Sequence, residues 1–423
     1  MRKAQSLFNL GAALLFMLSI LGACSKVEEG KPAENATNPS SEPSTRHDGA
    51  KPIAKRSQDA IDRAIKYLRK HQDPKTGAVS VALPVMPQTR HPGVTAMAVL
   101  AYLNAPHRSY NYKDDPFVRN ALDWVASLQK DDGSIYESDS IGYVTSLAVA
   151  ALVESGEASF AGRIEKARDF LLRLQANEES GYRPKDRFFG GVGYGGDERP
   201  DLSNTQFAVE AVRKAGLEPG HKFFKAAVTY LERCQNNSET NDQIWKDSEG
   251  NEVRPGNDGG AIYLPGESKA GIQVLPDGSR VFISYGSMSY ALLKTYLFCD
   301  IDRRDPRVRA VAKWCVSNFD LDKHPGFSAG EKGTEQYQGL YYYYYSMAKA
   351  LGVYGKDIIE DEAGVKRDWA RELSEKLLSL QRSDGSFVND QNGRWREGYA
   401  VIATCYATIA LEIALEALQN AGG

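Results

Sequence analysis

The sequence predicts an all-α fold, an α6/α6 toroid in which six outer helices surround six inner helices over residues 56–423. Three observations predict it: one helical motif recurs six times, an apolar helix of small residues follows each copy, and no region is rich in strand patterns. Helices that alternate between two compositions are typical of repeat proteins, whose units bury apolar faces against their neighbours. Because six pairs complete a ring, we expect closure; an open helical solenoid is the alternative.

The first helix of each pair carries the motif Ala-x-x-aromatic-aliphatic-x-x-x-Gln. Its apolar positions recur at helical spacing and its other positions are charged, so an amphipathic helix of the outer layer is expected. In four copies a glycine follows and marks a turn that ends the helix, at Gly77, Gly133, Gly181 and Gly385. The motif lies at 64–72, 121–129, 167–175 and 227–235, with weaker copies at 311–319 and 372–381.

The second helix of each pair is apolar around most of its circumference. Four of these helices share the pattern Thr-x-x-Ala-x-x-Ala, and two others hold the same place in their repeats. Helices without a polar face are buried on both sides, so these should form the inner wall of the ring. They are expected at 95–103, 145–153, 205–213, 285–297, 339–351 and 404–415.

The N-terminal 55 residues differ from the repeats. A basic start and a short apolar run predict an export signal over residues 1–23. The ending Leu-Gly-Ala-Cys resembles a bacterial lipoprotein cleavage box, which implies a lipid on Cys24; an ordinary secretory signal is the alternative. Residues 24–55 hold few apolar side chains and predict a disordered tether. The expected location is a bacterial membrane, with the lipid-anchored body in the periplasm or at the cell surface.

Charge and cysteine content exclude several functions. A net charge of −3 gives no electrostatic reason to expect nucleic acid as a partner. No two of Cys234, Cys299, Cys315 and Cys405 are spaced as a metal knuckle or a redox pair, and we expect buried free thiols. The sequence therefore predicts no metal site and no cofactor, and it leaves the oligomeric state open.

The long loops indicate where a site would lie. Each follows an outer helix, so all six emerge at the rim that holds the N-termini of the inner helices, where function concentrates on a rigid scaffold. In the longest loop, alternation around Pro276, Asp277 and Gly278 predicts a small β-hairpin near 271–284, either a lid or a surface decoration. The loops span 73–93, 130–143, 176–203, 236–284, 320–338 and 382–400.

The outer-helix motif, with its glycine, resembles the QW repeat of squalene and oxidosqualene cyclases. These belong to the terpenoid cyclase and protein prenyltransferase superfamily, and the resemblance covers almost the whole chain after the tether. It implies an α6/α6 toroid and a structural role for the repeat glutamines and aromatics. The terminal Trp of the repeat is replaced here by Val79, Ile135 or Phe387.

The segment "FFGGVGYGGDERPDLSNTQFAVEAV" follows the plan of the cyclase Asp-x-Asp-Asp-Thr motif, whose middle Asp protonates an alkene. Asp201 matches the first Asp, Ser203 the middle one and Asn204 the third. A serine hydroxyl is too weak an acid for that protonation, so this chemistry is not expected. No DDxxD cluster appears for ionisation-type chemistry, and the zinc ligands of protein prenyltransferases are missing as well.

The remaining candidates are polar and aromatic residues at the loop rim. We expect Asp201 and Glu397 as candidate catalytic acids or bases, although Asp201 could simply cap a helix and Glu397 could pair with Arg394 or Arg396 on the surface. Tyr337, Tyr341 and Tyr344 are expected on one helical face. The candidate ligand-binding residues are Asn204, Tyr194, Tyr285, Glu335, Gln336, Tyr337, Tyr341, Tyr344 and Trp395.

Three functions fit these residues. The first is a cyclase-like toroid whose central cavity binds or transforms an isoprenoid-like, small hydrophobic molecule. The second is a noncatalytic module that binds an envelope component, and the third is a polysaccharide-active toroid enzyme. A wide apolar cavity would favour the first two, and an acidic groove lined by Trp would favour the third. A centre filled by side chains of Tyr341–Tyr345 would favour an interaction scaffold.

Overall fold

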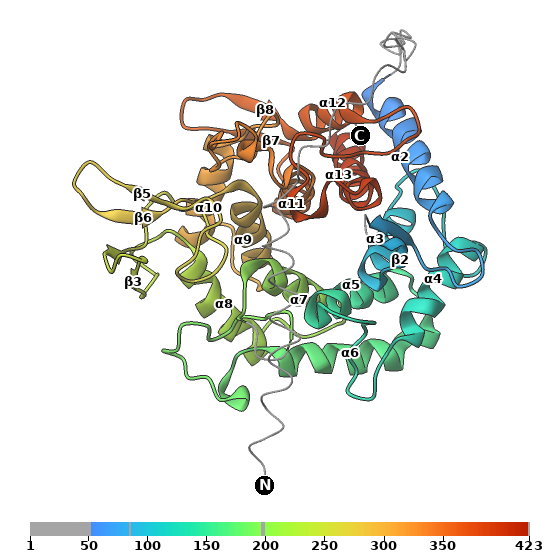
Figure 1. Cartoon of the computed structure of the whole chain (residues 1–423), viewed down its shortest axis with the longest axis horizontal. Coiled ribbons are helices and arrows are strands. Elements are labelled where there is room, and N and C mark those ends of the chain that lie inside the picture. Colours follow the sequence, from blue (N-terminus) through green and yellow to red (C-terminus); the bar gives the residue numbers. More distant parts are fainter. Residues whose placement is uncertain (1–51, 84–85, 196–198, 422–423) are drawn as a thin grey trace, which may run out of the picture. The chain divides into compact units, whose positions relative to one another are not determined.

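The computed structural model describes residues 52–83, 86–195 and 199–421. In these ranges twelve α-helices alternate between an outer and an inner layer (Figure 1), which confirms the predicted α/α toroid. The described residues belong to one compact unit. The predicted export signal, Cys24 and residues 24–51 of the predicted tether lie outside the described residues.

The outer layer consists of the helices that carry the glutamine motif. Each buries one apolar face and exposes a charged one, as α2 does with Ile61 and Leu68 on its buried side. Two of them begin with an aspartate N-cap followed by proline, a combination that starts a helix well. They are α2 (Ile53–Lys70), α4 (Pro116–Ser127), α6 (Ala161–Leu174), α8 (Lys222–Cys234), α10 (Pro306–Ser317) and α12 (Trp369–Leu380).

The inner helices form a closed ring. Each contacts the next along the chain, and the last contacts the first, so the expectation of closure is confirmed. They are α3 (Pro92–Leu103), α5 (Ile141–Glu154), α7 (Leu202–Lys214), α9 (Gly286–Phe298), α11 (Leu340–Tyr354) and α13 (Ala400–Ala421). Among the described residues α13 alone is long and apolar enough to cross a membrane, but 72% of its apolar window is buried in the ring. It is therefore a core helix.

Five glutamines of the repeat motif join neighbouring outer helices. Gln175 Nε2 donates to Gly190 O over 3.0 Å and to Phe223 O of the next outer helix over 2.9 Å. Gln381 repeats this contact with Ala60 O over 2.8 Å, which joins α12 to α2 and closes the outer layer. The other three are Gln72, Gln129 and Gln235. The glutamines are structural, as the family resemblance implied.

The repeat glycines fit against the same neighbouring helices. A Cβ on Gly190 would lie 1.8 Å from Ala226 O of α8, while a Cβ on Gly181 would meet nothing within 4 Å. The glycine of the third repeat is therefore Gly190, and the prediction of Gly181 was wrong. Residues 176–189, which include a 3-10 turn, are inserted between the glutamine and this glycine and shift the register.

Four two-stranded antiparallel hairpins decorate the ring. The predicted hairpin near 271–284 is confirmed as β5–β6, and it belongs to an insertion with its own small core of Trp245, Val253, Ile262 and Phe282. The pairs are β1 (Ser80–Leu83) with β2 (Met86–Arg90), β3 (Trp245–Lys246) with β4 (Glu252–Val253), β5 (Ile272–Val274) with β6 (Arg280–Phe282), and β7 (Ile358–Glu360) with β8 (Lys366–Asp368). The 3-10 helices are η2 (Ala158–Phe160), η3 (Glu178–Ser180), η4 (Glu335–Tyr337) and η5 (Arg394–Arg396).

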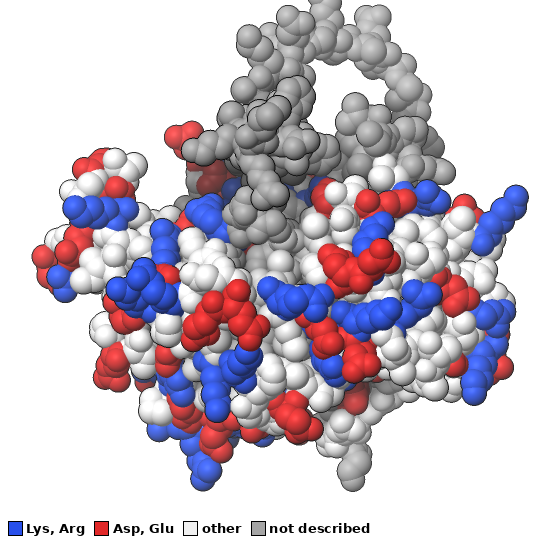
Figure 2. Space-filling model, turned by 90° about the horizontal axis from the view of Figure 1, so that it is seen from below, with Lys and Arg blue, Asp and Glu red and all other residues white. Residues whose placement is uncertain are grey.

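Charges of both signs cover the surface. Figure 2 shows lysine and arginine interspersed with aspartate and glutamate over the face in view, without a large region of one sign. The four cysteines of the described ranges are buried free thiols, as expected, and burial raises the pKa of Cys234 and Cys405 well above the usual range. Thiols held neutral in this way are inert packing groups.

Candidate functional site at the inner-helix N-termini

Asp201 caps the N-terminus of α7 and is almost completely buried. Its Oδ1 accepts from the backbone N–H of Asn204 over 2.8 Å, and its Oδ2 accepts from Asn204 Nδ2 over 2.7 Å. The alternative interpretation of Asp201 as a helix cap is thus confirmed. The segment that resembles the cyclase acid motif uses its first Asp to begin a helix.

Two tyrosines complete the surroundings of Asp201. Burial raises the pKa of Asp201 to about 6, and hydrogen bonds from Asn204 and Tyr263 oppose this rise. Tyr263 comes from the 236–284 insertion, and its carbonyl accepts from Leu202 N over 2.8 Å, which fixes the insertion to the start of α7. Burial also raises the pKa of Tyr194, whose hydroxyl is hydrogen-bonded to Tyr263. Asp201 therefore lies among tyrosine hydroxyls contributed by two different loops.

Glu397 caps a different helix, α11, across the gap between two repeats. Its Oε1 accepts from Tyr342 N over 2.7 Å and its Oε2 accepts from Asn389 Nδ2 over 2.9 Å. The side chain is fully buried, so the alternative of a surface pair with Arg394 or Arg396 was wrong. Burial raises the pKa of Glu397 to about 7, opposed by the hydrogen bonds from Asn389 and the α11 backbone.

Tyr342 connects the two capped helices. Its backbone N–H donates to Glu397, while its hydroxyl lies 2.8 Å from Ser203 Oγ and accepts from Gln206 Nε2 over 2.5 Å. Ser203 and Gln206 belong to α7, which is not adjacent to α11 in the ring. The contact therefore crosses the centre of the toroid.

Aromatic side chains fill the centre at this level. The Tyr143 and Tyr406 hydroxyls lie 3.1 Å apart, and Tyr406 packs against Tyr342 and Tyr345 at centroid distances of 5.5 and 5.3 Å. Phe207 packs against Tyr143 and Tyr345 as well. These five rings come from four inner helices and bridge non-neighbours. Where a central cavity was expected, these rings pack against one another between the inner helices.

The other predicted tyrosines support the loops. The hydroxyls of Tyr341 and Tyr344 donate to Val388 O over 3.3 Å and Leu321 O over 2.6 Å, and their rings lie 5.9 Å apart on α11. Tyr337 does not share their helical face, because it lies in the separate 3-10 helix η4. Tyr285 is buried against Phe327. Tyr342 and Tyr345 are the members of the tyrosine run that face the centre.

The remaining predicted residues lie around a buried histidine, His324. Its Nδ1 lies 2.7 Å from Gln338 O and its Nε2 accepts from Ser287 N over 2.9 Å, so the ring is neutral. Burial lowers the pKa of His324 to about 4. The Trp395 ring lies 6.4 Å from it, and the carbonyl of Gln336 accepts from His324 N. Glu335, the last candidate, is exposed to solvent.

Sequence reasoning missed Tyr143, Tyr263 and Tyr406. They come from different repeats, and no spacing in the sequence relates them. One of them, Tyr406, could have been predicted, because it is an aromatic residue in an inner helix made mostly of small residues. Within the described ranges no three His, Cys, Asp or Glu side chains gather in a way that could hold a metal ion.

No family model and no curated protein matches this sequence. Solved structures match over most of the chain. The type II terpene cyclase MstE from Scytonema, with geranylgeranyl dihydroxybenzoate bound, is 14% identical with a TM-score of 0.51 and covers 87% of this chain and 99% of its own. Its apo form is 13% identical with the same TM-score.

Two carbohydrate-active enzymes match equally well. An α-amylase from Clostridium perfringens is 12% identical with a TM-score of 0.51, covering 84% of this chain and 97% of its own. An unsaturated glucuronyl hydrolase specific for heparin is 11% identical with a TM-score of 0.50, covering 88% and 97%. At these identities the similarity establishes the α/α toroid fold, which hosts different chemistries.

Proposed function

We propose that the loop-bearing rim is a noncatalytic binding site for a carbohydrate. The observation that carries the proposal is a group of half-buried residues that offer ring faces and hydroxyls near Asp201: Tyr143, Tyr194, Ser203, Tyr263 and Tyr342. Ring faces provide stacking surfaces, and hydroxyls both donate and accept, which suits a polyhydroxylated ring. The amylase and hydrolase with this fold support the idea that the scaffold accommodates saccharides.

Two buried amide groups support a ligand that donates hydrogen bonds. Asn204 Oδ1 and Gln206 Oε1 have no partner among the described residues. Buried acceptors normally find a donor, and a ligand hydroxyl or a water molecule would supply one. An isoprenoid chain has no donor to offer these oxygens, so it would leave them unsatisfied.

Binding without catalysis fits the two carboxyl groups. Asp201 and Glu397 are both engaged by N–H groups at helix N-termini, and both are buried. Glycoside hydrolysis requires two carboxyl groups that flank the scissile bond and exchange protons with it. Here the carboxyl oxygens of Asp201 and Glu397 instead accept the backbone N–H groups that start α7 and α11. In the proposal the saccharide belongs to the cell envelope, to which a lipid on Cys24 would hold the protein.

An isoprenoid-like ligand is the second candidate. The five rings of Tyr143, Phe207, Tyr342, Tyr345 and Tyr406 would give such a ligand aromatic surroundings, but they pack against one another here and have to part to admit it. The fold similarity to a type II terpene cyclase points the same way. Proton-initiated cyclisation is not part of this candidate, since Ser203 stands where the cyclases have their acid.

Binding of detergent-solubilised full-length protein to insoluble glucan, chitin and peptidoglycan tests the proposal. We expect at least one polysaccharide to retain the protein, and Tyr194→Ala and Tyr263→Ala to weaken retention at least tenfold. Tyr136→Ala, in another rim loop, is the control and should bind as the wild type does.

Mass spectrometry of an organic extract of the purified protein separates the two candidates. A copurified isoprenoid without retention by any polysaccharide would contradict the carbohydrate proposal and support the second candidate. Retention that survives both tyrosine substitutions would place the carbohydrate elsewhere and contradict the site. Absence of retention and of lipid would contradict both.

A further inference from the structure

Three inner helices are tied by an ion triad in the second half of the ring. Glu210 of α7 accepts from Lys294 Nζ of α9 over 2.7 Å and from Lys349 Nζ of α11 over 2.5 Å. Glu210 lies nine residues after Asp201, about 13 Å further along α7. The triad is therefore separate from the rim site and nearer the C-termini of the inner helices.

The triad carries more positive than negative charge. A third ammonium, that of Lys214, lies close enough to help lower the pKa of Glu210, and its own partner is Glu154 over 2.8 Å. Three lysines thus face two glutamates. Burial and the neighbouring ammonium of Lys349 lower the pKa of Lys294 to about 8, although Glu210 opposes this shift.

The two lysines also have more N–H donors than hydrogen-bond acceptors around them. Each ammonium has three N–H groups, and the described residues supply one acceptor atom to each of Lys294 and Lys349. One turn before Lys349, on the same face of α11, Ser346 Oγ is buried without a partner in the described part of the chain. Lys294 Nζ also lies over the rings of Phe207 and Phe298, 5.5 and 6.0 Å from their centroids, while Ser346 Oγ still requires a partner.

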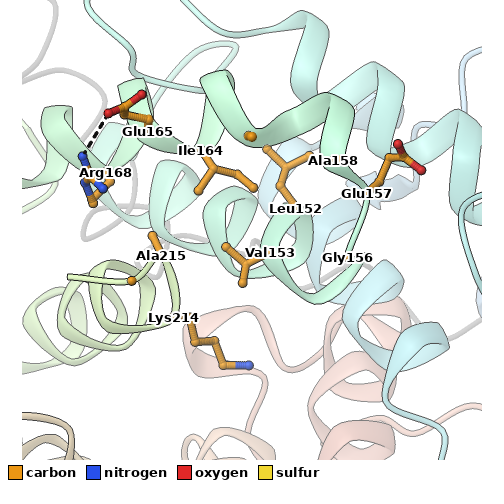
Figure 3. Close-up of a pocket in the computed structure, with 12 residues that line it drawn as sticks. Leu152, Val153, Gly156, Glu157, Ala158, Ile164, Glu165, Arg168, Lys214 and Ala215 are labelled. Atoms are coloured by element: carbon orange, nitrogen blue, oxygen red, sulfur yellow. Dashed lines mark ion pairs between the residues drawn. The ribbon is translucent and has the colours of Figure 1, made fainter. Parts of the chain in front are cut away.

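A cavity opens at the same end of the ring. It has a volume of about 380 Å³ and lies between the C-termini of α5 and α7 and the start of α6. Figure 3 shows Leu152, Val153, Ile164 and Ala215 around it, with the Lys214 side chain extending from its edge. Of the lysines near Glu210, Lys214 alone lines this cavity, whose walls also carry Glu157, Glu165 and Arg168.

We propose that Lys294, Lys349 and Ser346 bind an anionic oxygen group, a phosphate or carboxylate, which enters from the rim that holds the C-termini of the inner helices. The group accepts the ammonium and hydroxyl protons that Glu210 leaves unused. The anionic group reaches the site at Lys349, because 18% of the Lys349 side chain is exposed while Lys294 is enclosed.

Titration calorimetry of the full-length protein at low salt, with inorganic phosphate and with octyl phosphate, tests this site. Glu210→Gln removes the internal competitor for both ammonium groups, so phosphate should bind at least tenfold more tightly. Lys349→Met should weaken binding at least tenfold, and Lys349→Arg should retain it. Lys225→Met, an exposed lysine on α8, is the charge-matched control and should leave the dissociation constant unchanged.

The two probes distinguish the source of the anion. Octyl phosphate that binds more tightly than inorganic phosphate indicates an amphiphile head, and equal affinities indicate a free anion. Circular dichroism melts establish that each variant is folded. Absence of phosphate binding in both the wild type and the folded Glu210→Gln protein would overturn the proposal, as would binding that Lys349→Met and Lys225→Met reduce equally.

Discussion

The backbone N–H of Tyr342 donates to Oε1 of Glu397 over 2.7 Å, so the carboxyl group of one repeat caps the inner helix of the preceding repeat. The N-cap residue of α11 is Gly339, which has no side chain to cap the helix. Because orphan N–H groups at a buried helix end require acceptors, Glu397 supplies what Gly339 lacks. This role makes stability, rather than catalysis, the first property to change when Glu397 is altered.

Glu397→Gln should change how the free energy of unfolding depends on pH. The pKa of Glu397 is raised from 4.5 to about 7 in the fold, so unfolding releases a proton in this window and the wild type loses stability as the pH rises through it. The loss should be about 3 kcal/mol. Because glutamine does not titrate, the wild-type stability minus that of the variant should fall by this amount between pH 4 and pH 7.5.

Urea unfolding at several pH values measures this difference. The variant's free energy of unfolding is also shifted because its contact with Asn389 changes, but that shift does not vary with pH. Asp201→Asn should show the same sign over a lower window, because burial raises the pKa of Asp201 from 3.8 to about 6. A wild-type advantage that stays constant with pH would contradict the burial of an ionisable Glu397.

The sequence predicted correctly those features that depend on residue spacing within a single repeat. The alternation of helices, the glutamine at each outer-helix end and the position of Asp201 before α7 all follow from local spacing. The burial of Glu397 could not be predicted, because Arg394 and Arg396 on either side suggest an exposed segment. The meeting of Tyr143 with Tyr406 depends on the curvature of the whole ring, which no local pattern specifies.

Gly190→Ala should destabilise the ring far more than Gly181→Ala. Both glycines have φ near +90°, so alanine strains the backbone at each, at about 1–3 kcal/mol. At Gly190 the new Cβ would also lie 1.8 Å from Ala226 O, which forces α8 to move. We expect a loss above about 3 kcal/mol at Gly190 when the clash is added to the strain. Equal losses in urea unfolding would contradict the assignment of Gly190 to the repeat.

Gln381→Ala should weaken the closure of the outer layer. The side chain joins α12 to α2 through Ala60 O and holds Gly385 O, so its removal leaves two carbonyls without this donor. We expect a loss of about 2 kcal/mol in the free energy of unfolding. Gln419→Ala, at an exposed position near the end of α13, is the matched control and should change stability little. If both variants unfold alike, the glutamine contact does not hold the ring closed.

His324→Phe should remove a pH dependence of the opposite sign to that of Glu397. Burial lowers the pKa of His324 from 6.5 to about 4, against the opposing hydrogen bond to Gln338 O, so the unfolded chain binds a proton first as the pH falls. Because of this titration, the free energy of unfolding of the wild type should fall by about 3 kcal/mol between pH 6.5 and pH 4. Phenylalanine keeps the packing against Tyr343 but cannot titrate, and it leaves Ser287 N and Gln338 O without their ring partner. The variant should therefore be clearly less stable than the wild type at pH 7.5 and close to it at pH 4.5. A gap of the same size at both values would mean that the fold does not lower the pKa of His324.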